Sequence, residues 1–193
     1  MKTIDYYNNN AQAFYARTIK VDVTDSYEKV LKYLPEKAKI LDAGCGVGRD
    51  TKYFLSKGHT VSAFDASEKM TQMAFKETGV NVMHSTFQEL NFENRFDCVW
   101  ASASLLHIPY DMTQEIYEKI HKALKPNGIF YASYKYGDGY METPDRDFYN
   151  MNENNIMPYL RGLFDVIEIW QNQDHSIVSS PDGTWLYFIV RKI

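Results

Sequence analysis

Three glycines at alternate positions, Gly44, Gly46 and Gly48, follow a short apolar run and precede a helical pattern. Glycine permits a tight turn and lets a ligand approach the main chain, because no Cβ stands in the way. The first N–H groups of the following helix would also be unpaired. The segment therefore predicts a ligand-binding bend at the carboxyl end of a buried strand, where open α/β sheets hold their ligands.

Two carboxylates accompany this bend. Asp42 stands two positions before Gly44, and Asp65 ends the next apolar run. A carboxylate beside the bend favours an amine-bearing ligand over a pyrophosphate, whose negative charge it would repel. A carboxylate at position 65 can accept two hydrogen bonds from a ribose diol. The spacing also argues against a dinucleotide, because G-x-G-x-x-G needs a glycine where Arg49 stands.

The elements that must position these residues alternate between short apolar runs and amphipathic stretches, which is typical of a parallel sheet flanked by helices. The pattern predicts strands over 39–44, 60–65, 80–84, 96–102 and 128–134, and helices over 22–34, 49–57, 67–77, 112–124 and 152–161. Two final strands, 164–170 and 185–191, are expected to be antiparallel, because the loop that holds Ser179 to Gly183 is too short for a crossover helix.

The predicted fold class is therefore α/β: a Rossmann-like, seven-stranded, mostly parallel sheet with an antiparallel last strand and helices on both faces. The segment 137–151 is predicted to be polar and irregular. At 193 residues with 45% hydrophobic residues, the chain is expected to form a single domain over residues 1–193.

The charge balance and the cysteine count limit the partners. With 21 basic and 25 acidic residues and no basic run, neither a nucleic acid nor an anionic membrane is expected as a partner. Two cysteines indicate no disulfide framework, and no metal-ligand spacing is present, so no metal is expected. The absence of a signal-peptide pattern or a long apolar stretch favours a cytoplasmic protein. The oligomeric state is left open.

The pattern Asp-x-Gly-x-Gly-x-Gly with an acidic end to the next strand resembles the class I S-adenosylmethionine-dependent methyltransferases. The resemblance runs from about residue 20 to the end and includes FDCVW at 96–100, LLH at 105–107 and LKPNGI at 124–129. More narrowly, the chain is similar to small bacterial methyltransferases related to tellurite resistance. The resemblance implies S-adenosyl-L-methionine as cofactor and S-adenosyl-L-homocysteine as product.

The resemblance also implies a set of cofactor contacts. The methionine portion would be surrounded by Asp42, Gly44, Gly46 and Gly48, and Asp65 would hold the ribose. Ala66 and Met70 would lie near the adenine edge, and Thr86 and Phe87, within the segment 85–88, would cover its other side. Ala101 and Ser102 would lie against the sulfonium.

The segment 1–20 is expected to fold over the cofactor as a lid, as such segments do in this family. Tyr15 and Arg17 would then close on the cofactor, with Arg17 binding its carboxylate, and Tyr6 would face the acceptor. An ordinary packing helix with a surface arginine is the alternative interpretation. Tyr134 and Tyr136, after the fifth strand, are predicted to line the acceptor pocket.

His107 follows the fourth strand and is the candidate general base, because histidine titrates near physiological pH. The alternative is that His107 braces the loop through a hydrogen bond to a backbone carbonyl. The predicted reaction is an in-line methyl transfer to a small-molecule acceptor. Two alternatives stay open: a macromolecular acceptor (RNA or protein), and a catalytically silent cofactor-binding module.

Overall fold

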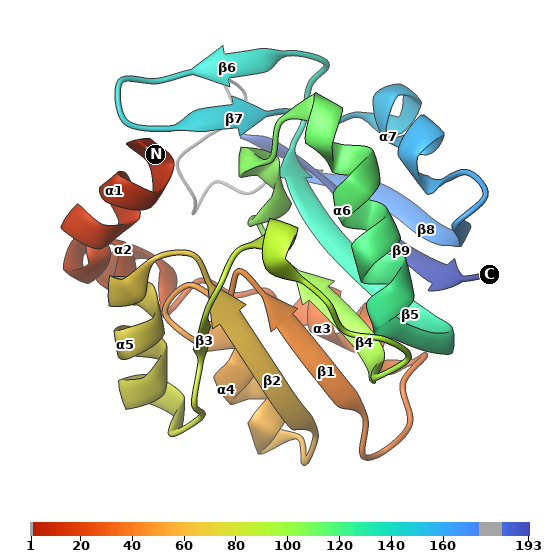
Figure 1. Ribbon diagram of the computed structural model, residues 1–193, viewed down its shortest axis with the longest axis horizontal. Helices are drawn as coiled ribbons and strands as arrows, with labels where there is room; N and C mark the ends of the chain where they lie inside the picture. Colours follow the sequence, from red (N-terminus) through yellow and green to blue (C-terminus); the bar gives the residue numbers. More distant parts are fainter. Residues whose placement is uncertain (1, 174–182) are drawn as a thin grey trace.

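The computed structural model of the chain describes residues 2–173 and 183–193. Its centre is a seven-stranded sheet in the order β3-β2-β1-β4-β5-β9-β8 (Figure 1). The strands of this sheet are β1 (Lys39–Ala43), β2 (Thr60–Asp65), β3 (Met83–His84), β4 (Phe96–Ala101), β5 (Leu124–Lys135), β8 (Phe164–Gln173) and β9 (Thr184–Lys192).

The pairing directions confirm the predicted fold class. Strands β3, β2, β1, β4 and β5 pair in parallel, whereas β9 is antiparallel to both β5 and β8. The last strand of the chain is thus the reversed one, and it lies inside the sheet between β5 and β8. Most of the predicted loop between the last two strands, residues 174–182, lies outside the described residues.

Helices cover both faces of the sheet (Figure 1). They are α1 (Lys2–Asn9), α2 (Ala11–Thr18), α3 (Thr24–Leu31), α4 (Arg49–Ser56), α5 (Glu68–Thr78), α6 (Tyr110–Ala123) and α7 (Glu153–Leu160), with short 3-10 turns η1 (Phe87–Glu89) and η2 (Leu105–His107). Helix α5 begins at Ser67, which caps the N–H of Met70, and ends at Gly79 in a left-handed conformation. The helix predicted over 67–77 therefore agrees with α5 to within one residue at each end.

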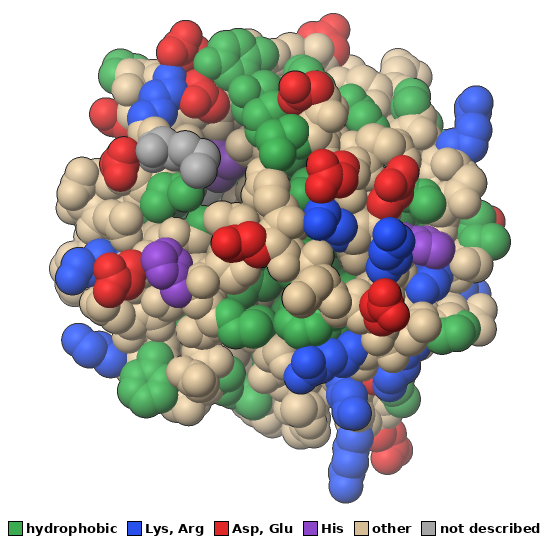
Figure 2. Space-filling view, in the orientation of Figure 1, with side chains coloured by type: hydrophobic (Ala, Val, Ile, Leu, Met, Phe, Trp, Pro, Cys, Tyr) green, Lys and Arg blue, Asp and Glu red, His purple; other side chains and the backbone are tan. Residues whose placement is uncertain are grey.

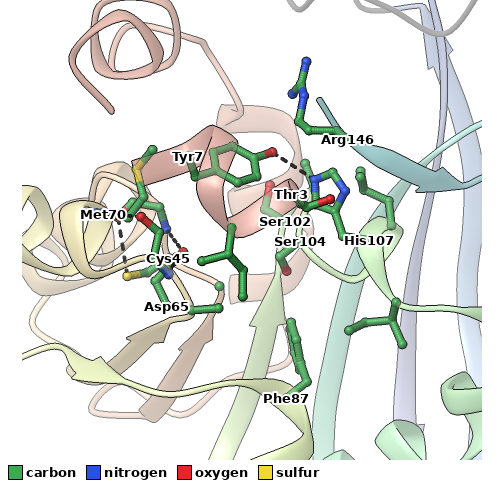
Figure 3. Close-up of a pocket in the computed structure, with 18 of the residues that line it drawn as sticks. Thr3, Tyr7, Cys45, Asp65, Met70, Phe87, Ser102, Ser104, His107 and Arg146 are labelled. Carbon is green, nitrogen blue, oxygen red and sulfur yellow. Dashed lines mark hydrogen bonds between the residues drawn. The ribbon is translucent and has the colours of Figure 1, made fainter. Parts of the chain in front are cut away.

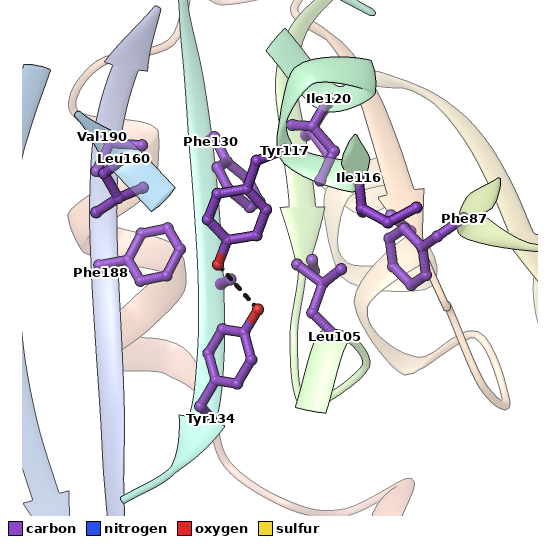
Figure 4. Close-up of a cluster of buried hydrophobic side chains, with 14 of the residues drawn as sticks. Phe87, Leu105, Ile116, Tyr117, Ile120, Phe130, Tyr134, Leu160, Phe188 and Val190 are labelled. Carbon is purple, nitrogen blue, oxygen red and sulfur yellow. Dashed lines mark hydrogen bonds between the residues drawn. The ribbon is translucent and has the colours of Figure 1, made fainter. Parts of the chain in front are cut away.

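Successive residues of each strand point to opposite faces, so one strand supplies two separate hydrophobic clusters. Ile40 and Tyr131 pack with Tyr27 and Phe54 from the side of α3 and α4. The strand residues between these point to the other face of the sheet, where they pack against α6 and α7. Figure 4 shows this second cluster, which includes Leu105, Ile116, Tyr117, Ile120, Phe130, Tyr134, Leu160, Phe188 and Val190.

The segment 137–151 is not irregular, contrary to the prediction. It forms an antiparallel hairpin of β6 (Tyr140–Glu142) and β7 (Asp147–Tyr149) beside the main sheet. The turn is closed by Thr143, whose N–H donates to the carbonyl of Arg146 at 2.9 Å and whose hydroxyl accepts from the Arg146 N–H at 3.0 Å. Strands this short carry too few alternating residues to give a pattern, which is why the polar composition misled the prediction.

A buried carboxylate connects three elements below the glycine bend. Asp50, in the first turn of α4, is 6% exposed. It accepts hydrogen bonds from the hydroxyl of Tyr27 on α3 at 2.6 Å and from the indole N–H of Trp100 on β4 at 2.7 Å. The guanidinium of Arg49 completes the set, with Nη2 at 3.0 Å from Oδ2. This network fixes the start of α4 against the sheet.

We expect Asp50→Ala to lower the free energy of unfolding by about 3–5 kcal/mol, because the substitution leaves the half-buried Arg49 cation, the Tyr27 hydroxyl and the Trp100 N–H without their shared partner. The matched control is Glu115→Ala, which removes an exposed carboxylate paired with Lys119 at 3.6 Å and should cost at most about 1 kcal/mol. Urea unfolding measures both values. Equal losses in the two variants would contradict the structural role of Asp50.

Candidate functional site

A cavity of about 620 Å³ lies across the carboxyl ends of the parallel strands. Its walls come from the glycine bend after β1, the end of β2, the loop after β4, the end of β5, helix α1 and the β6–β7 hairpin (Figure 3). The bend is therefore located where the sequence predicts a ligand site. Among the described residues, no group of three or more His, Cys, Asp or Glu side chains could hold a metal ion.

The glycine bend is packed too closely for side chains. Gly44 has a φ of +74°, and a Cβ there would lie 2.5 Å from the Cβ of Ser104 in the loop after β4. Gly44 and Gly46 both line the cavity. Gly48 does not: a Cβ at this position would lie 3.0 Å from the Cα of Ala74 on α5, so Gly48 allows helix packing rather than ligand contact.

Asp42 is likewise not on the cavity wall, contrary to the prediction. It shares the parity of Ile40 on β1 and therefore points toward α4, where it accepts a hydrogen bond from the Thr51 hydroxyl at 2.6 Å. Burial, together with the nearby charge of Asp50, raises the pKa of Asp42 to about 8. Ala101 is also fully buried below the cavity floor, and its neighbour Ser102 lines the wall instead.

Asp65 lies on the wall at the end of β2 (Figure 3). Its Oδ2 accepts from the N–H of Gly46 at 2.9 Å and its Oδ1 from the N–H of Ser67 at 2.8 Å. A carboxylate has about four acceptor positions, so the two that remain can accept hydrogen bonds from ligand hydroxyls. Burial raises the pKa of Asp65, against the lowering effect of the two N–H groups.

The surroundings of Asp65 suit a nucleoside. The predicted adenine-side residues Ala66, Met70, Thr86 and Phe87 all line this end of the cavity. The Phe87 ring packs edge-on against Phe64 at 5.1 Å between centroids, which holds it in place at the wall. A flat apolar surface beside a diol-binding carboxylate fits the base and sugar of an adenosyl group.

The N-terminal helices form another wall, but not through the predicted residues. Thr3, Ile4 and Tyr7 from α1, and Phe14 from α2, line the cavity. Positions 3, 7 and 14 recur at helical spacing, a signal that would have identified this inner face.

Tyr6, Tyr15 and Arg17 do not line the cavity, so their predicted ligand contacts are not supported. Arg17 is exposed, and its Nη2 donates to the Tyr6 hydroxyl at 3.3 Å. The Tyr15 hydroxyl donates to Glu77 on α5 at 2.8 Å. Tyr15 packs instead in the cluster of Val47 and Met70, and the centroid of the Tyr6 ring lies 4.1 Å from the guanidinium carbon of Arg146.

Polar contacts at both ends hold α1 across the cavity. Lys2 pairs with Glu142 at 2.7 Å and with Asp147 at 2.9 Å, both on the β6–β7 hairpin. At the other end, Asn8 accepts from the hydroxyl of Ser67 at 2.8 Å. Helix α1 therefore bridges the hairpin and the start of α5, and covers the space between them.

His107 is buried in this covered region and is fixed by both ring nitrogens (Figure 3). Its Nδ1 lies 2.6 Å from the carbonyl oxygen of Asp147, so Nδ1–H is the donor there. Its Nε2 therefore accepts from the Tyr7 hydroxyl at 2.9 Å. Burial lowers the pKa of His107 to about 4. A neutral ring with both nitrogens bonded favours the bracing interpretation over that of a general base.

Tyr134 and Tyr136 are not on the cavity wall either. Tyr134 faces α6 and shares a 2.9 Å hydrogen bond with the hydroxyl of Tyr117 (Figure 4). Tyr136 donates to Glu153 at 3.2 Å. Their neighbours Ser133 and Lys135 line the cavity instead. Successive strand residues point to opposite faces, so the cavity must be lined by these two residues if Tyr134 points into the core.

Part of the chain is similar in sequence to known methyltransferases. Residues 40–128 match the model of a family described as a methyltransferase domain. An uncharacterized methyltransferase of Synechocystis sp. is 37% identical over 98 residues, a match that spans 48% of this chain and 44% of that protein. The chain thus spans less than half the length of this relative.

Solved structures extend the likeness to the whole chain. The 1,6-didemethyltoxoflavin-N1-methyltransferase of Burkholderia thailandensis, solved with its acceptor and S-adenosylhomocysteine, superposes with a TM-score of 0.77 at 26% identity over 98% of this chain and 84% of that one. A TehB-like S-adenosylmethionine-dependent methyltransferase of Corynebacterium glutamicum shares the fold, with a TM-score of 0.74 at 18% identity over 98% of this chain and 99% of that one.

Residues 40–128 match a methyltransferase domain, and nearly the whole chain shares the fold of the S-adenosylmethionine-dependent methyltransferases with which it superposes. In the described part of the chain, no helix is long and apolar enough to cross a membrane.

We expect His107→Phe to lower the free energy of unfolding by about 1–3 kcal/mol at neutral pH, because the Tyr7 hydroxyl and the Asp147 carbonyl lose a buried partner. The folded-state pKa of about 4 lies below the value of about 6.5 for exposed histidine. The unfolded chain therefore takes up the proton first, and the stability contributed by His107 falls as the pH drops from about 6.5 toward 4.

The difference in the free energy of unfolding between the unsubstituted protein and the His107→Phe variant should accordingly become smaller as the pH falls. Urea unfolding at a series of pH values between about 7 and 4 measures it. A difference that stays constant over this range would show that the pKa of His107 is the same in the folded and the unfolded protein, and would return His107 to consideration as a proton-accepting group.

Proposed function

We propose that this protein transfers a methyl group from S-adenosylmethionine to a small-molecule acceptor. The observation that carries the proposal is one covered cavity with two chemically different ends. Asp65, Met70 and Phe87 form a nucleoside end, and Ser133, Lys135 and the β6–β7 hairpin form an acceptor end. The glycine bend at Gly44 and Gly46 connects them.

At the nucleoside end, Asp65 would hold the ribose hydroxyls while Met70 and Phe87 pack beside the base. The main chain at Gly44 and Gly46, together with Ser102, would adjoin the methionyl part. When bound, S-adenosylmethionine would supply a methyl group on a positively charged sulfur. The acceptor's lone pair would form the new bond to the methyl carbon, and the electron pair of the carbon–sulfur bond would leave with the sulfur as S-adenosylhomocysteine.

The acceptor end favours a small molecule over a macromolecule. The ion pairs of Lys2 join helix α1 to the hairpin above the acceptor end. Beneath these ion pairs, Tyr7 and His107 share a hydrogen bond. A polymer segment would have to displace these contacts. The Burkholderia neighbour, whose acceptor is the small molecule 1,6-didemethyltoxoflavin, supports the same choice.

The contribution of this chain to the reaction is orientation and exclusion of water rather than proton transfer. The lone pair of His107 is engaged by Tyr7, and its low pKa makes it a weak base. Alignment of reactants in a closed cavity is worth as much as about 7–11 kcal/mol in ideal intramolecular reactions. The acceptor is therefore expected to be a soft nucleophile, or one that has lost its proton before it binds.

We expect Asp65→Ala to weaken binding of S-adenosylhomocysteine by roughly 10- to 150-fold, since hydrogen bonds to a charged group are each worth about 1.5–3 kcal/mol. The matched control is Asp97→Ala at the opposite end of the sheet, where the carboxylate also accepts a backbone N–H, that of Lys39 at 2.8 Å. Calorimetry should show unchanged affinity in the control. Equal affinity in both variants would contradict the ribose-binding role.

We expect the purified protein to bind S-adenosylmethionine and not a nicotinamide dinucleotide, and to release S-adenosylhomocysteine with some members of a metabolite panel that includes thiols. The assay records S-adenosylhomocysteine release with each compound. Release only with RNA or with a protein fraction would support a macromolecular acceptor. Binding of the cofactor without release in any arm would support a silent cofactor-binding module.

A further inference from the structure

Lys135 is a buried cation at the acceptor end of the cavity, and no counter-ion for it lies within the described residues. Its side chain lines the wall, and the residue is 6% exposed. Within residues 2–173 and 183–193, no carboxylate pairs with it. Its ammonium lies 3.6 Å from the centroid of the Phe148 ring on β7. Desolvation, followed by the nearby charge of Arg146, lowers its pKa to about 8.

Two further donors without acceptors lie on the same wall. Trp185 on β9 is directly opposite Lys135 in the β5–β9 register, and paired residues on one face have Cβ atoms roughly 5 Å apart. Its indole N–H is buried and has no hydrogen-bond partner in the described part of the chain, and the same holds for the Nε–H of Arg146. Both residues line the cavity.

The carboxylates that line the cavity do not neutralise these donors. Asp147 is engaged by Lys2 at 2.9 Å and by the Tyr140 hydroxyl at 2.6 Å, and Asp50 is paired with Arg49. Asp65 is on β2, separated from β5 by two intervening strands, so its main chain is roughly 14 Å from that of Lys135 across the sheet. Among residues 2–173 and 183–193, therefore, no carboxylate compensates the positive charge at this end of the cavity.

The charge is also not part of a broad basic surface on the face seen in Figure 2, where Lys and Arg are interspersed with Asp and Glu. Buried charges are costly unless they are paired and hydrogen-bonded. Three neighbouring side chains that offer N–H donors, with no carboxylate paired to them in the described part of the chain, thus describe a site whose complement is an anion.

We infer that Lys135, Trp185 and Arg146 form an oxyanion subsite, and that the methyl acceptor carries a carboxylate or a comparable oxyanion group. The inference rests on the proposed function and narrows its substrate class. The apolar and aromatic neighbours Phe148, Leu106 and Ile108 on the same cavity wall suit a small organic acid, whose body packs against them while its charged group meets the three donors.

The main competing occupant is the carboxylate of the cofactor itself. The strand separation argues for the acceptor, because the nucleoside end at Asp65 lies on the far side of the glycine bend from Lys135. The two occupants make different predictions. An acceptor subsite binds an added anion while the cofactor product is present, whereas a cofactor subsite would already be filled.

The experiment titrates protein saturated with S-adenosylhomocysteine with benzoate, acetate and inorganic phosphate, and with neutral benzamide as a shape control, by calorimetry. We expect at least one oxyanion to bind and benzamide to bind far less. Lys135→Met and Arg146→Met should each weaken oxyanion binding about 30-fold or more, because each removes one partner of a buried charge pair. Lys122→Met, at an exposed position on α6, removes the same charge and should leave binding unchanged.

Parallel titrations with S-adenosylhomocysteine and 5′-methylthioadenosine, which lacks the amino-acid tail, separate the alternatives. We expect Lys135→Met to leave both affinities unchanged. If Lys135→Met weakened binding of S-adenosylhomocysteine but not of 5′-methylthioadenosine, the inference would be overturned, because the cation would then bind the carboxylate of the cofactor. Failure of every oxyanion to bind would also overturn it, while normal S-adenosylhomocysteine binding would leave the proposed function standing. If S-adenosylhomocysteine itself does not bind, the proposed function fails first.

Discussion

The main chains that follow β1 and β4 approach each other at Gly44 more closely than any side chain would permit. A Cβ at this position would lie 2.5 Å from that of Ser104, and the Ser104 hydroxyl donates to the carbonyl of Ala43 at 2.7 Å. This contact sets the floor of the cavity. The N–H of Gly46 in the bend also donates a hydrogen bond to Asp65. The position of Asp65 at the nucleoside end therefore depends on the same close approach of the two main chains.

Above this floor, the cavity is covered by segments that are distant in sequence. Lys2 on α1 pairs with the hairpin, and His107 links the loop after β4 to β7 through the carbonyl of Asp147 and to α1 through Tyr7. One neutral histidine thereby connects three elements. Burial disfavours the charged form of the imidazole, so the ring stays neutral. Its role is therefore to hold these three elements in place rather than to transfer a proton.

The two ends of the cavity differ in how their polar groups are satisfied. At the nucleoside end, the Asp65 carboxylate accepts backbone N–H groups and keeps acceptor positions for a ligand. At the acceptor end, Lys135, Trp185 and Arg146 present donors without acceptors in the described part of the chain. In the proposed function, an adenosyl group with hydroxyl donors and an acceptor with negative charge would be the respective complements, and this asymmetry would orient both reactants in one cavity.

The sequence by itself determined the sheet, the bend and the strand-end carboxylate, because each rests on local patterns: apolar periodicity, the spacing of Gly44 and Gly46, and an acid that ends a strand. Only the tertiary structure decided which side chains face the cavity. One residue of register reverses the face of a side chain, so Asp42 and Tyr134 point into the core, while Lys135 lines the wall. Likewise, Tyr7 rather than Tyr6 faces inward, since the docking of α1 selects one side of the helix, and no local pattern contains the surface against which it docks.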